Sequence, residues 1–241
     1  QIDMEELESK ITDRTKMIVI VNPSNPTGGV LSRETLEKLS QIAIKNDLLV
    51  VADEIYSQLV YDDTKHVSIA SLPGMKERTI TLGGFSKAYS MTGWRLGYMC
   101  APKGIIAACV RVHQYTITCA SSFVQDAAIT ALRDCADDVE AMRQEYQRRK
   151  DYAVKALNEI DGISCNNPQG AFYIFVNVKS LGMPSMEVAE YFLEEAKVAM
   201  VPGSAFGSEG EGYLRLSYSC SYEDLQEAIR RIKDAVEKLK K

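Results

Sequence analysis

The sequence predicts an α/β protein of two domains: residues 1–145, built on a parallel-rich open sheet, and residues 146–241, a smaller α+β unit. Two observations support this fold class. Short β-branched runs alternate with helical patterns in the first half of the chain, which is typical of an α/β sheet. After Gly170 the pattern changes to a short series of strands and helices, beyond a long helical segment able to bridge two domains.

In the first half, buried strands are predicted over residues 16–22 and 48–52, because both runs are β-branched and end in polar turn residues. Ser32 fits the N-cap of a helix between them. In that helix, apolar residues recur at helical spacing at Leu36, Leu39, Ile42 and Ala43.

Two more short strands are predicted over residues 79–82 and 96–100, each bounded by Gly or Pro. A helical pattern follows over residues 105–132, and a long helix is expected over residues 138–160, ended by Asp161-Gly162. These segments complete the alternation of the first domain and lead into the second.

The second domain is predicted to contain strands over residues 171–178, 199–201 and 213–218, with a helix over residues 185–196. In the final helix, Ser221 and Asp224 form a start similar to a capping box. One apolar stripe of that helix is expected to pack in the core: Leu225, Ile229, Ile232, Val236 and Leu239.

Composition limits the functional classes. The 241 residues carry a net charge of −5 with both signs interspersed, which argues against a nucleic-acid surface. Apolar runs are too short to cross a bilayer, and the first ten residues do not form a secretory signal, so we expect no membrane partner. Six cysteines without a Cys-x-x-Cys pair are predicted to be buried thiols in a reducing cytosol. We therefore expect a cytoplasmic protein.

Polar residues that follow predicted strands are candidates for ligand binding, because ligands of open α/β sheets bind outside the carboxyl ends of the strands. Asn25 lies in a turn rich in Pro and Gly after the first strand, and Asp53 ends the second, with Tyr56 three residues on. A carboxylate at Asp53 would suit a cation such as a protonated ring nitrogen. The alternatives are an ordinary turn for Asn25 and a helix N-cap for Asp53.

Ser86 and Lys87 follow the third strand in the segment Gly83-Gly84-Phe85-Ser86-Lys87. In an apolar, glycine-lined setting, desolvation would make the lysine amine nucleophilic. Most lysines, however, are solvated surface groups, and that alternative stays open.

Two arginines are candidates for anion binding. Arg95 lies eight residues after Lys87, and its guanidinium would suit a phosphate, although a salt bridge would explain it equally well. Arg215 lies within a predicted strand, where a charge is costly unless it is paired. Its partner is either the carboxylate of a ligand or a buried carboxylate of the protein. His66 and His113 are too isolated to suggest a metal site, and no metal is expected.

Four ordered motifs together resemble those of class I and II aminotransferases: Asn25-Pro26-Thr27-Gly28, Asp53-Glu54-Ile55-Tyr56, Ser86-Lys87 and Met91-Thr92-Gly93-Trp94-Arg95-Leu96-Gly97. Gly203 and the later Tyr213-Leu214-Arg215-Leu216 are similar to that family's C-terminal domain. The resemblance covers essentially the whole chain.

The resemblance implies the fold of pyridoxal-phosphate-dependent transferases (fold type I), here a partial large domain plus the small C-terminal domain. It implies pyridoxal 5'-phosphate as cofactor, held by Asn25, Asp53, Tyr56, Ser86, Lys87 and Arg95. Lys87 would form the Schiff base and move the proton, Asp53 would keep the pyridine nitrogen protonated, and Tyr56 would contact the phenolic oxygen. Asn25 and Arg215 would bind the substrate carboxylate.

The implied reaction is transfer of an amino group from an amino acid to a 2-oxo acid, usually by a homodimer. We expect the family's N-terminal segment to be missing, so that this piece is inactive alone and exposes surfaces that the segment would cover. One local departure is Gly84, where many relatives carry a hydroxyl. The alternatives are a carbon–sulfur lyase or related synthase on the same fold, or a non-catalytic fragment or sensor.

Overall fold

The computed structural model describes residues 1–239, which fall into two compact units. The first unit contains residues 1–23 and 29–141, and the second contains residues 24–28 and the chain from residue 142 onward. The domain boundary expected after residue 145 stays a prediction. The grouping of residues 24–28 with the second unit is a tertiary feature that the sequence pattern did not indicate.

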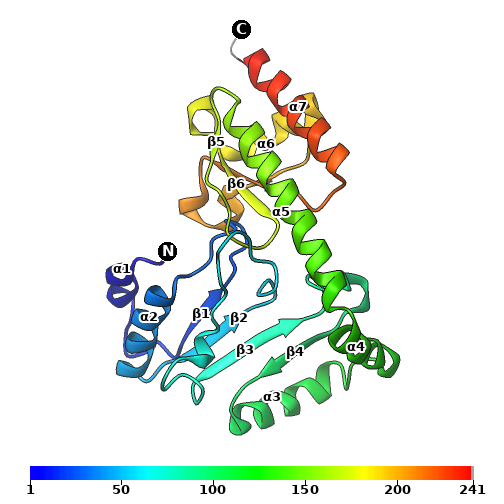
Figure 1. The fold of residues 1–241 in the computed structure, drawn as a ribbon. Helices are drawn as coiled ribbons and strands as arrows, with labels where there is room; N and C mark the ends of the chain where they lie inside the picture. Colours follow the sequence, from blue (N-terminus) through cyan, green and yellow to red (C-terminus); the bar gives the residue numbers. More distant parts are fainter. Residues whose placement is uncertain (240–241) are drawn as a thin grey trace. The chain divides into compact units, whose positions relative to one another are not determined.

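The first unit is built on a four-stranded sheet of order β1-β2-β3-β4 (Figure 1). β1 (Met17–Val21), β2 (Leu49–Asp53) and β3 (Thr79–Gly84) are parallel, and β4 (Gly97–Cys100) is antiparallel to β3. The carboxyl ends of the first three strands therefore lie at the same edge of the sheet. This edge is where the sequence placed the candidate residues.

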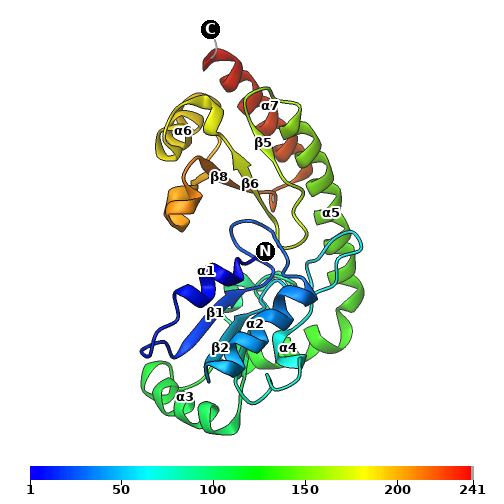
Figure 2. The same ribbon diagram turned by 90° about the vertical axis from the view of Figure 1, so that its left-hand side faces the viewer.

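One face of this sheet forms the core of the unit with α2 (Arg33–Lys45), beside which α1 (Met4–Ser9) lies (Figure 2). The predicted N-cap is confirmed, since Ser32 Oγ accepts a hydrogen bond of 3.1 Å from the Thr35 amide. The core cluster is formed by Ile18, Ile20, Leu36, Leu39, Ala43, Leu48, Val50, Ala52, Ile69, Leu72 and Met75. On the opposite face of β1, Val19 is 64% exposed.

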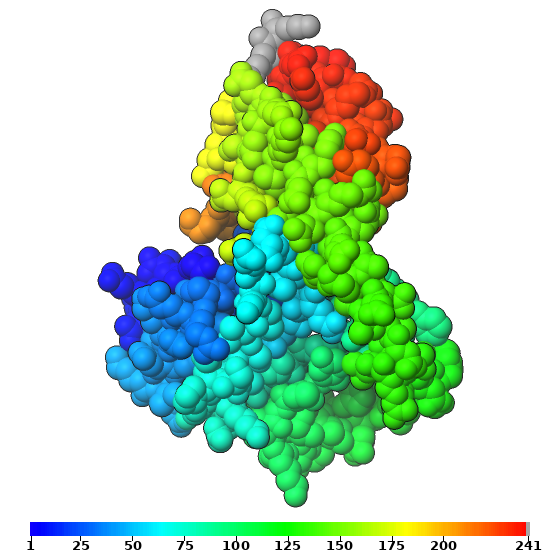
Figure 3. Space-filling view, viewed as in Figure 1, coloured from blue at the N-terminus to red at the C-terminus, as the bar shows by residue number. Residues whose placement is uncertain are grey.

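The helical pattern expected over residues 105–132 is two helices, α3 (Lys103–Thr116) and α4 (Ser122–Asp134). None of the residues of α3, all of which the structure describes, is buried, and the green surface of Figure 3 includes this part of the chain. α4 buries Val124, Ala128 and Ala131.

The expectation of buried cysteines is wrong. All six are free thiols, and none of them is buried: Cys100, Cys119 and Cys220 are exposed, and Cys109, Cys135 and Cys165 are half-buried. The physical reason is local, because β4 and α3, which carry two of them, lie largely open to solvent.

The second unit has an antiparallel sheet of order β5-β6-β8-β7. Its strands are β5 (Ser164–Cys165), β6 (Tyr173–Asn177), β7 (Val201–Pro202) and β8 (Tyr213–Ser217). The helices of this part are α6 (Ser185–Tyr191), α7 (Tyr222–Leu239) and most of α5 (Ala136–Asn158), which begins in the first unit.

Three details of this unit differ from the sequence prediction. The short strand β7 lies one to two residues later than expected, and β5 was not predicted. The expected helix over residues 185–196 ends in a π-helical turn, Phe192–Ala196. In α7 the apolar stripe is buried except for Leu239, which is 38% exposed at the end of the helix. The capping start is confirmed, because the Asp224 amide donates to Ser221 Oγ at 3.1 Å.

Candidate functional site

Asp53 is the last residue of β2, beside Val21 of β1 and Leu82 of β3. Its Oδ1 accepts a hydrogen bond of 3.1 Å from the Ile55 amide, so the side chain shapes a turn. The alternative of a helix N-cap is wrong, because residues 55–58 form a turn and no helix begins there. In the described residues no cation lies within ion-pair distance of this carboxylate. It can therefore accept a hydrogen bond from a donor group of a ligand.

Lys87 is placed by a short loop that leaves β3. Phe85 and Met91 are buried in a cluster with Ala128 and Ala131 of α4, and the Met91 amide donates to Phe85 O at 3.2 Å. This anchoring fixes both ends of the segment that carries Ser86 and Lys87. A loop held by two buried side chains presents its intervening residues in one arrangement.

Lys87 and Tyr56 meet at the carboxyl edge of the sheet. Lys87 Nζ lies 5.8 Å from the centre of the Tyr56 ring, and Tyr56 is 3% exposed. Because β2 and β3 are adjacent parallel strands, the residues that follow them share this edge. The structure thus brings together the lysine and the tyrosine predicted from separate motifs.

Arg95 and Ser86 lie in the same unit. Arg95 is exposed, has a left-handed backbone with φ of 55°, and donates from Nη1 to Thr92 O at 2.7 Å. Its other guanidinium donors have no partner in the described chain. Ser86 is half-buried. Both side chains can therefore offer donors to an anion.

Gly84, the local departure from the family pattern, sits in a tight place. A Cβ at this position would lie 3.0 Å from Ile55 Cδ1, 3.1 Å from Gly97 Cα and 3.2 Å from Leu96 O. Such distances are shorter than ordinary van der Waals contact, so a side chain here would require its neighbours to shift. A residue with a side chain would therefore fit poorly between β3, β4 and Ile55 at this position.

Asn25 and Arg215 come together in the second unit, 190 residues apart in sequence. Arg215 Nη1 donates to Asn25 Oδ1 at 2.8 Å. The loop that carries Asn25 is held by Gly28, whose carbonyl accepts from the amides of Gln169 and Gly170, both at 2.8 Å. The two residues predicted to bind the substrate carboxylate are therefore neighbours.

The charge of Arg215 has no protein counter-ion in the described chain, where no carboxylate lies within ion-pair distance of its guanidinium. Its Nε is buried and makes no hydrogen bond. The alternative raised by the sequence, a buried carboxylate of the protein, finds no such partner among residues 1–239. A buried Nε–H without a hydrogen bond is unfavourable even on a half-buried arginine, and an anionic ligand is a partner that would satisfy it.

Sequence reasoning did not identify the aromatic residues around Arg215. The Tyr173 and Phe206 rings lie with their centres 4.6 Å and 5.0 Å from Arg215 Cζ. The signal available in the sequence was the alternation of Tyr173 and Phe175 in a strand that pairs with the arginine strand. The pairing itself could not be known from one sequence.

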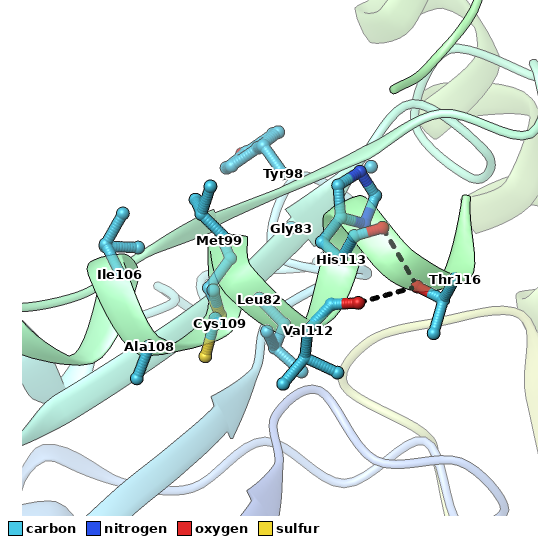
Figure 4. Close-up of a pocket in the computed structure, with 12 residues that line it drawn as sticks. Leu82, Gly83, Tyr98, Met99, Ile106, Ala108, Cys109, Val112, His113 and Thr116 are labelled. Carbon is cyan, nitrogen blue, oxygen red and sulfur yellow. Dashed lines mark hydrogen bonds between the residues drawn. The ribbon is translucent and has the colours of Figure 1, made fainter. Parts of the chain in front are cut away.

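The first unit also contains a hollow of about 900 Å³ (Figure 4). It is lined by β3, β4 and α3, including Tyr98, Met99 and His113, and none of the predicted site residues lines it. Thr116 Oγ1 donates to His113 O at 3.1 Å within α3. His66, the other histidine, lies with Nε2 3.3 Å from Glu54 Oε2.

Two features are absent from residues 1–239. The described side chains contain no group of three or more His, Cys, Asp or Glu arranged to hold a metal ion. In the same part of the chain, no helix combines the length and the apolar character that crossing a membrane requires.

Comparison with known proteins decides the family. A family model described as aminotransferase class I and II matches residues 1–232. The chain belongs to this family. The resemblance predicted from the motifs is thereby confirmed, and the family is one that generally depends on pyridoxal phosphate.

Relatives of this aminotransferase-family chain are longer than it is. An aspartate aminotransferase of Pyrococcus abyssi is 49% identical over 100% of this chain and 62% of the relative. Aromatic-amino-acid aminotransferase 2 of Thermococcus litoralis is 47% identical over the same shares. The chain spans about three fifths of the length of the curated relatives it matches.

Solved structures of the family confirm the predicted fold class. An aromatic aminotransferase from Pyrococcus horikoshii OT3 matches with a TM-score of 0.97 and 46% identity, over 100% of this chain and 65% of that chain. An aspartate aminotransferase from Rhizobium meliloti matches with a TM-score of 0.94 and 36% identity, over 98% of this chain and 62% of that chain. The fold is therefore a partial fold type I transferase.

Proposed function

We propose that this chain is part of a pyridoxal-phosphate-dependent aminotransferase, which moves an amino group from an amino acid to a 2-oxo acid and attaches its cofactor through Lys87. The observation that carries the proposal is the position of Lys87 Nζ, 5.8 Å from the Tyr56 ring, at the sheet edge where Asp53 ends β2. Family membership supports the same reaction.

The residues of this edge fit the chemistry of the cofactor. When bound, pyridoxal phosphate supplies an electron sink through its protonated ring nitrogen. The Asp53 carboxylate, which has no cationic partner in the described chain, would hold the proton on that nitrogen. Lys87 Nζ would remove the proton from the substrate α-carbon and deliver it again as general base and acid. The Tyr56 hydroxyl would donate to the phenolic oxygen of the cofactor.

Arg95 and Ser86 are proposed to bind the cofactor phosphate. Arg95 uses Nη1 on Thr92 O, which leaves Nη2 and Nε as donors and also fixes the direction of the guanidinium. A guanidinium and a hydroxyl together suit a phosphate, because charge-assisted hydrogen bonds to phosphate oxygens are short and strong.

Arg215 and Asn25 are proposed to bind the α-carboxylate of the substrate. What supports this role is the unpaired Nε of Arg215 and the hydrogen bond from its Nη1 to Asn25 Oδ1. Because that bond uses the amide oxygen of Asn25, its Nδ2 stays a donor. The part of Asn25 in binding the cofactor rests on the family resemblance alone.

We also propose that the complete protein is a cytoplasmic homodimer that acts on amino acids and 2-oxo acids, without a nucleic-acid or membrane partner. The six free thiols support a reducing compartment, and the net charge of −5 supports the exclusion of nucleic acid.

Reduction with borohydride after addition of pyridoxal phosphate, followed by peptide mapping, tests the proposed attachment. We expect the reduced adduct on Lys87, and its loss in Lys87→Ala. The matched control is Lys76→Ala, which removes an exposed lysine from the loop before β3 and should keep the adduct. Equal labelling of the wild type and Lys87→Ala would place the attachment elsewhere and overturn the proposal.

A further inference from the structure

Arg215 lies in a row of aromatic side chains on one face of the second sheet. Tyr173 and Phe175 on β6 pair with Ser217 and Arg215 on β8, so their side chains share that face. Phe206 reaches the same place from the turn 203–206, which lies beside β8 (Figure 2). The guanidinium on β8 therefore lies among rings from two other segments of the unit, β6 and the turn 203–206.

The two rings nearest the guanidinium differ in exposure. Tyr173 is 7% exposed, whereas Phe206 is 39% exposed and has its ring centre 5.0 Å from Arg215 Cζ. Phe206 is also in edge contact with Phe175, at 6.3 Å and 82°. Tyr173 is thus a buried wall of the arginine site, and Phe206 is its outer, partly solvated wall.

Arg215 has few hydrogen bonds to hold its guanidinium, so the Phe206 ring beside it matters for its position. The only hydrogen bond of its guanidinium in the described chain is the one to Asn25, and its buried Nε–H has none. A ring face attracts a cation and excludes water without using any of its N–H donors. Aromatic walls can therefore hold the guanidinium in place while leaving the Nε–H available for a ligand oxygen.

We propose that Phe206 is a positioning residue that holds the Arg215 guanidinium and shields its Nε–H from water, so that a carboxylate can bind there. The proposal rests on the proposed function in one respect, the carboxylate as ligand. Phe206 touches the arginine and acts through it. It should affect the order of the guanidinium even when no ligand is present.

The first test is hydrogen exchange of the Arg215 Nε–H in the ligand-free 241-residue chain, followed by ¹⁵N NMR and assigned by loss of the signal in Arg215→Lys. In Phe206→Leu, which keeps apolar cover but removes the ring, we expect exchange to quicken about tenfold. Phe206→Tyr restores a ring and should stay within about twofold of the wild type. Phe123→Leu, at a 65% exposed ring on α4, is the matched control and should change nothing.

The second test is titration with pyruvate, a 2-oxo acid that carries the expected carboxylate. We expect the Arg215 Nε–H signal to shift and saturate, with a dissociation constant about three- to tenfold higher in Phe206→Leu and restored in Phe206→Tyr. Circular dichroism of each variant checks that it is folded.

The outcomes distinguish the positioning role of Phe206 from the proposal that Arg215 binds a carboxylate. Unchanged Nε–H exchange in Phe206→Leu, or exchange as fast in Phe206→Tyr as in Phe206→Leu, overturns the positioning role. A wild-type chain that does not bind pyruvate overturns the carboxylate as ligand and, with it, the substrate role proposed for Arg215. Adduct formation at Lys87 is measured independently, so its failure would count against the cofactor assignment alone.

Discussion

Replacing Gly28 by Ala should displace the loop that carries Asn25 from the segment of residues 168–173, which it contacts in the second unit. Gly28 has a φ of +68°, and a Cβ there would lie 2.5 Å from Pro168 Cβ and 2.8 Å from Tyr173 O. The left-handed backbone costs an alanine roughly 1–2 kcal/mol. Overpacking adds about 1–3 kcal/mol, which gives a loss of about 2–5 kcal/mol in the free energy of unfolding.

Gly182 provides the matched control, because its φ is +72° and no atom lies within 4 Å of the position its Cβ would take. Gly182→Ala should therefore show only the backbone cost, about 1–2 kcal/mol. The assay is urea unfolding followed by circular dichroism, with the difference in unfolding free energy taken from the midpoints at equal slope.

Hydrogen exchange at the Gln169 and Gly170 amides gives the local readout, since both donate to Gly28 O. These amides should lose protection in Gly28→Ala and keep it in Gly182→Ala. Equal losses of stability in the two variants would show that the contacts of Gly28 with Pro168 and Tyr173 do not constrain the loop. The reasoning from close packing would then be refuted.

Two further predictions concern helices of the second unit. Arg148 and Arg149 donate to Glu145 and hold its pKa at about 2, below the usual 4.5, so its stabilising effect is complete above pH 4.5 and lost as the pH falls toward 2. Because Glu145 is 34% exposed, Glu145→Gln should cost about 1 kcal/mol or less at pH 6. The urea midpoints of the variant and the wild type should draw together below pH 4.5 and converge as the pH approaches 2, and a gap independent of pH would contradict this. Ser185 is fully buried and donates from its amide and Oγ to Glu211 at 2.7 Å and 2.9 Å, so Ser185→Ala should lower the unfolding free energy by about 1–2 kcal/mol. An unchanged urea midpoint would show that the hydroxyl contributes nothing.

Local sequence patterns predicted the strongest elements of the fold. β1, β2 and α2 lie within two residues of their predicted positions. The two strands are continuous β-branched runs that end in polar residues, and the apolar residues of the helix recur at helical spacing after the N-cap Ser32. Shorter elements were missed. β5 has only two residues, too few for any period to appear. The break between α3 and α4, residues 117–121, has no proline or glycine to mark it.

The first unit shows why part of the site was predictable. In a parallel sheet the strands share a direction, so residues that follow neighbouring strands meet at one edge whatever their separation in sequence. Tyr56 and Lys87 are an example, with 5.8 Å between the lysine nitrogen and the ring centre. For these residues, knowing where each strand ends was sufficient to predict that they lie close together.

The second unit shows the limit of the same reasoning. The contact between Asn25 and Arg215 spans 190 residues and depends on a loop that packs with a distant part of the chain. The sequence indicated that an arginine within a strand needs a partner. Whether that partner is a protein carboxylate or a ligand depends on the tertiary structure. No carboxylate among the described residues pairs with Arg215, which supports the proposal of a ligand carboxylate.

The loop of residues 24–28 therefore connects folding with function. Its backbone is fixed through Gly28 O, and its side chain Asn25 takes one donor of Arg215 and leaves Nε unpaired. A protein that only needed stability would gain by pairing that charge within the chain, since an unpartnered buried donor costs about 1–3 kcal/mol. The arrangement is favourable only if an anion from outside completes it. Under the proposed function, the same unpaired donor that weakens the fold is the group that would bind the carboxylate.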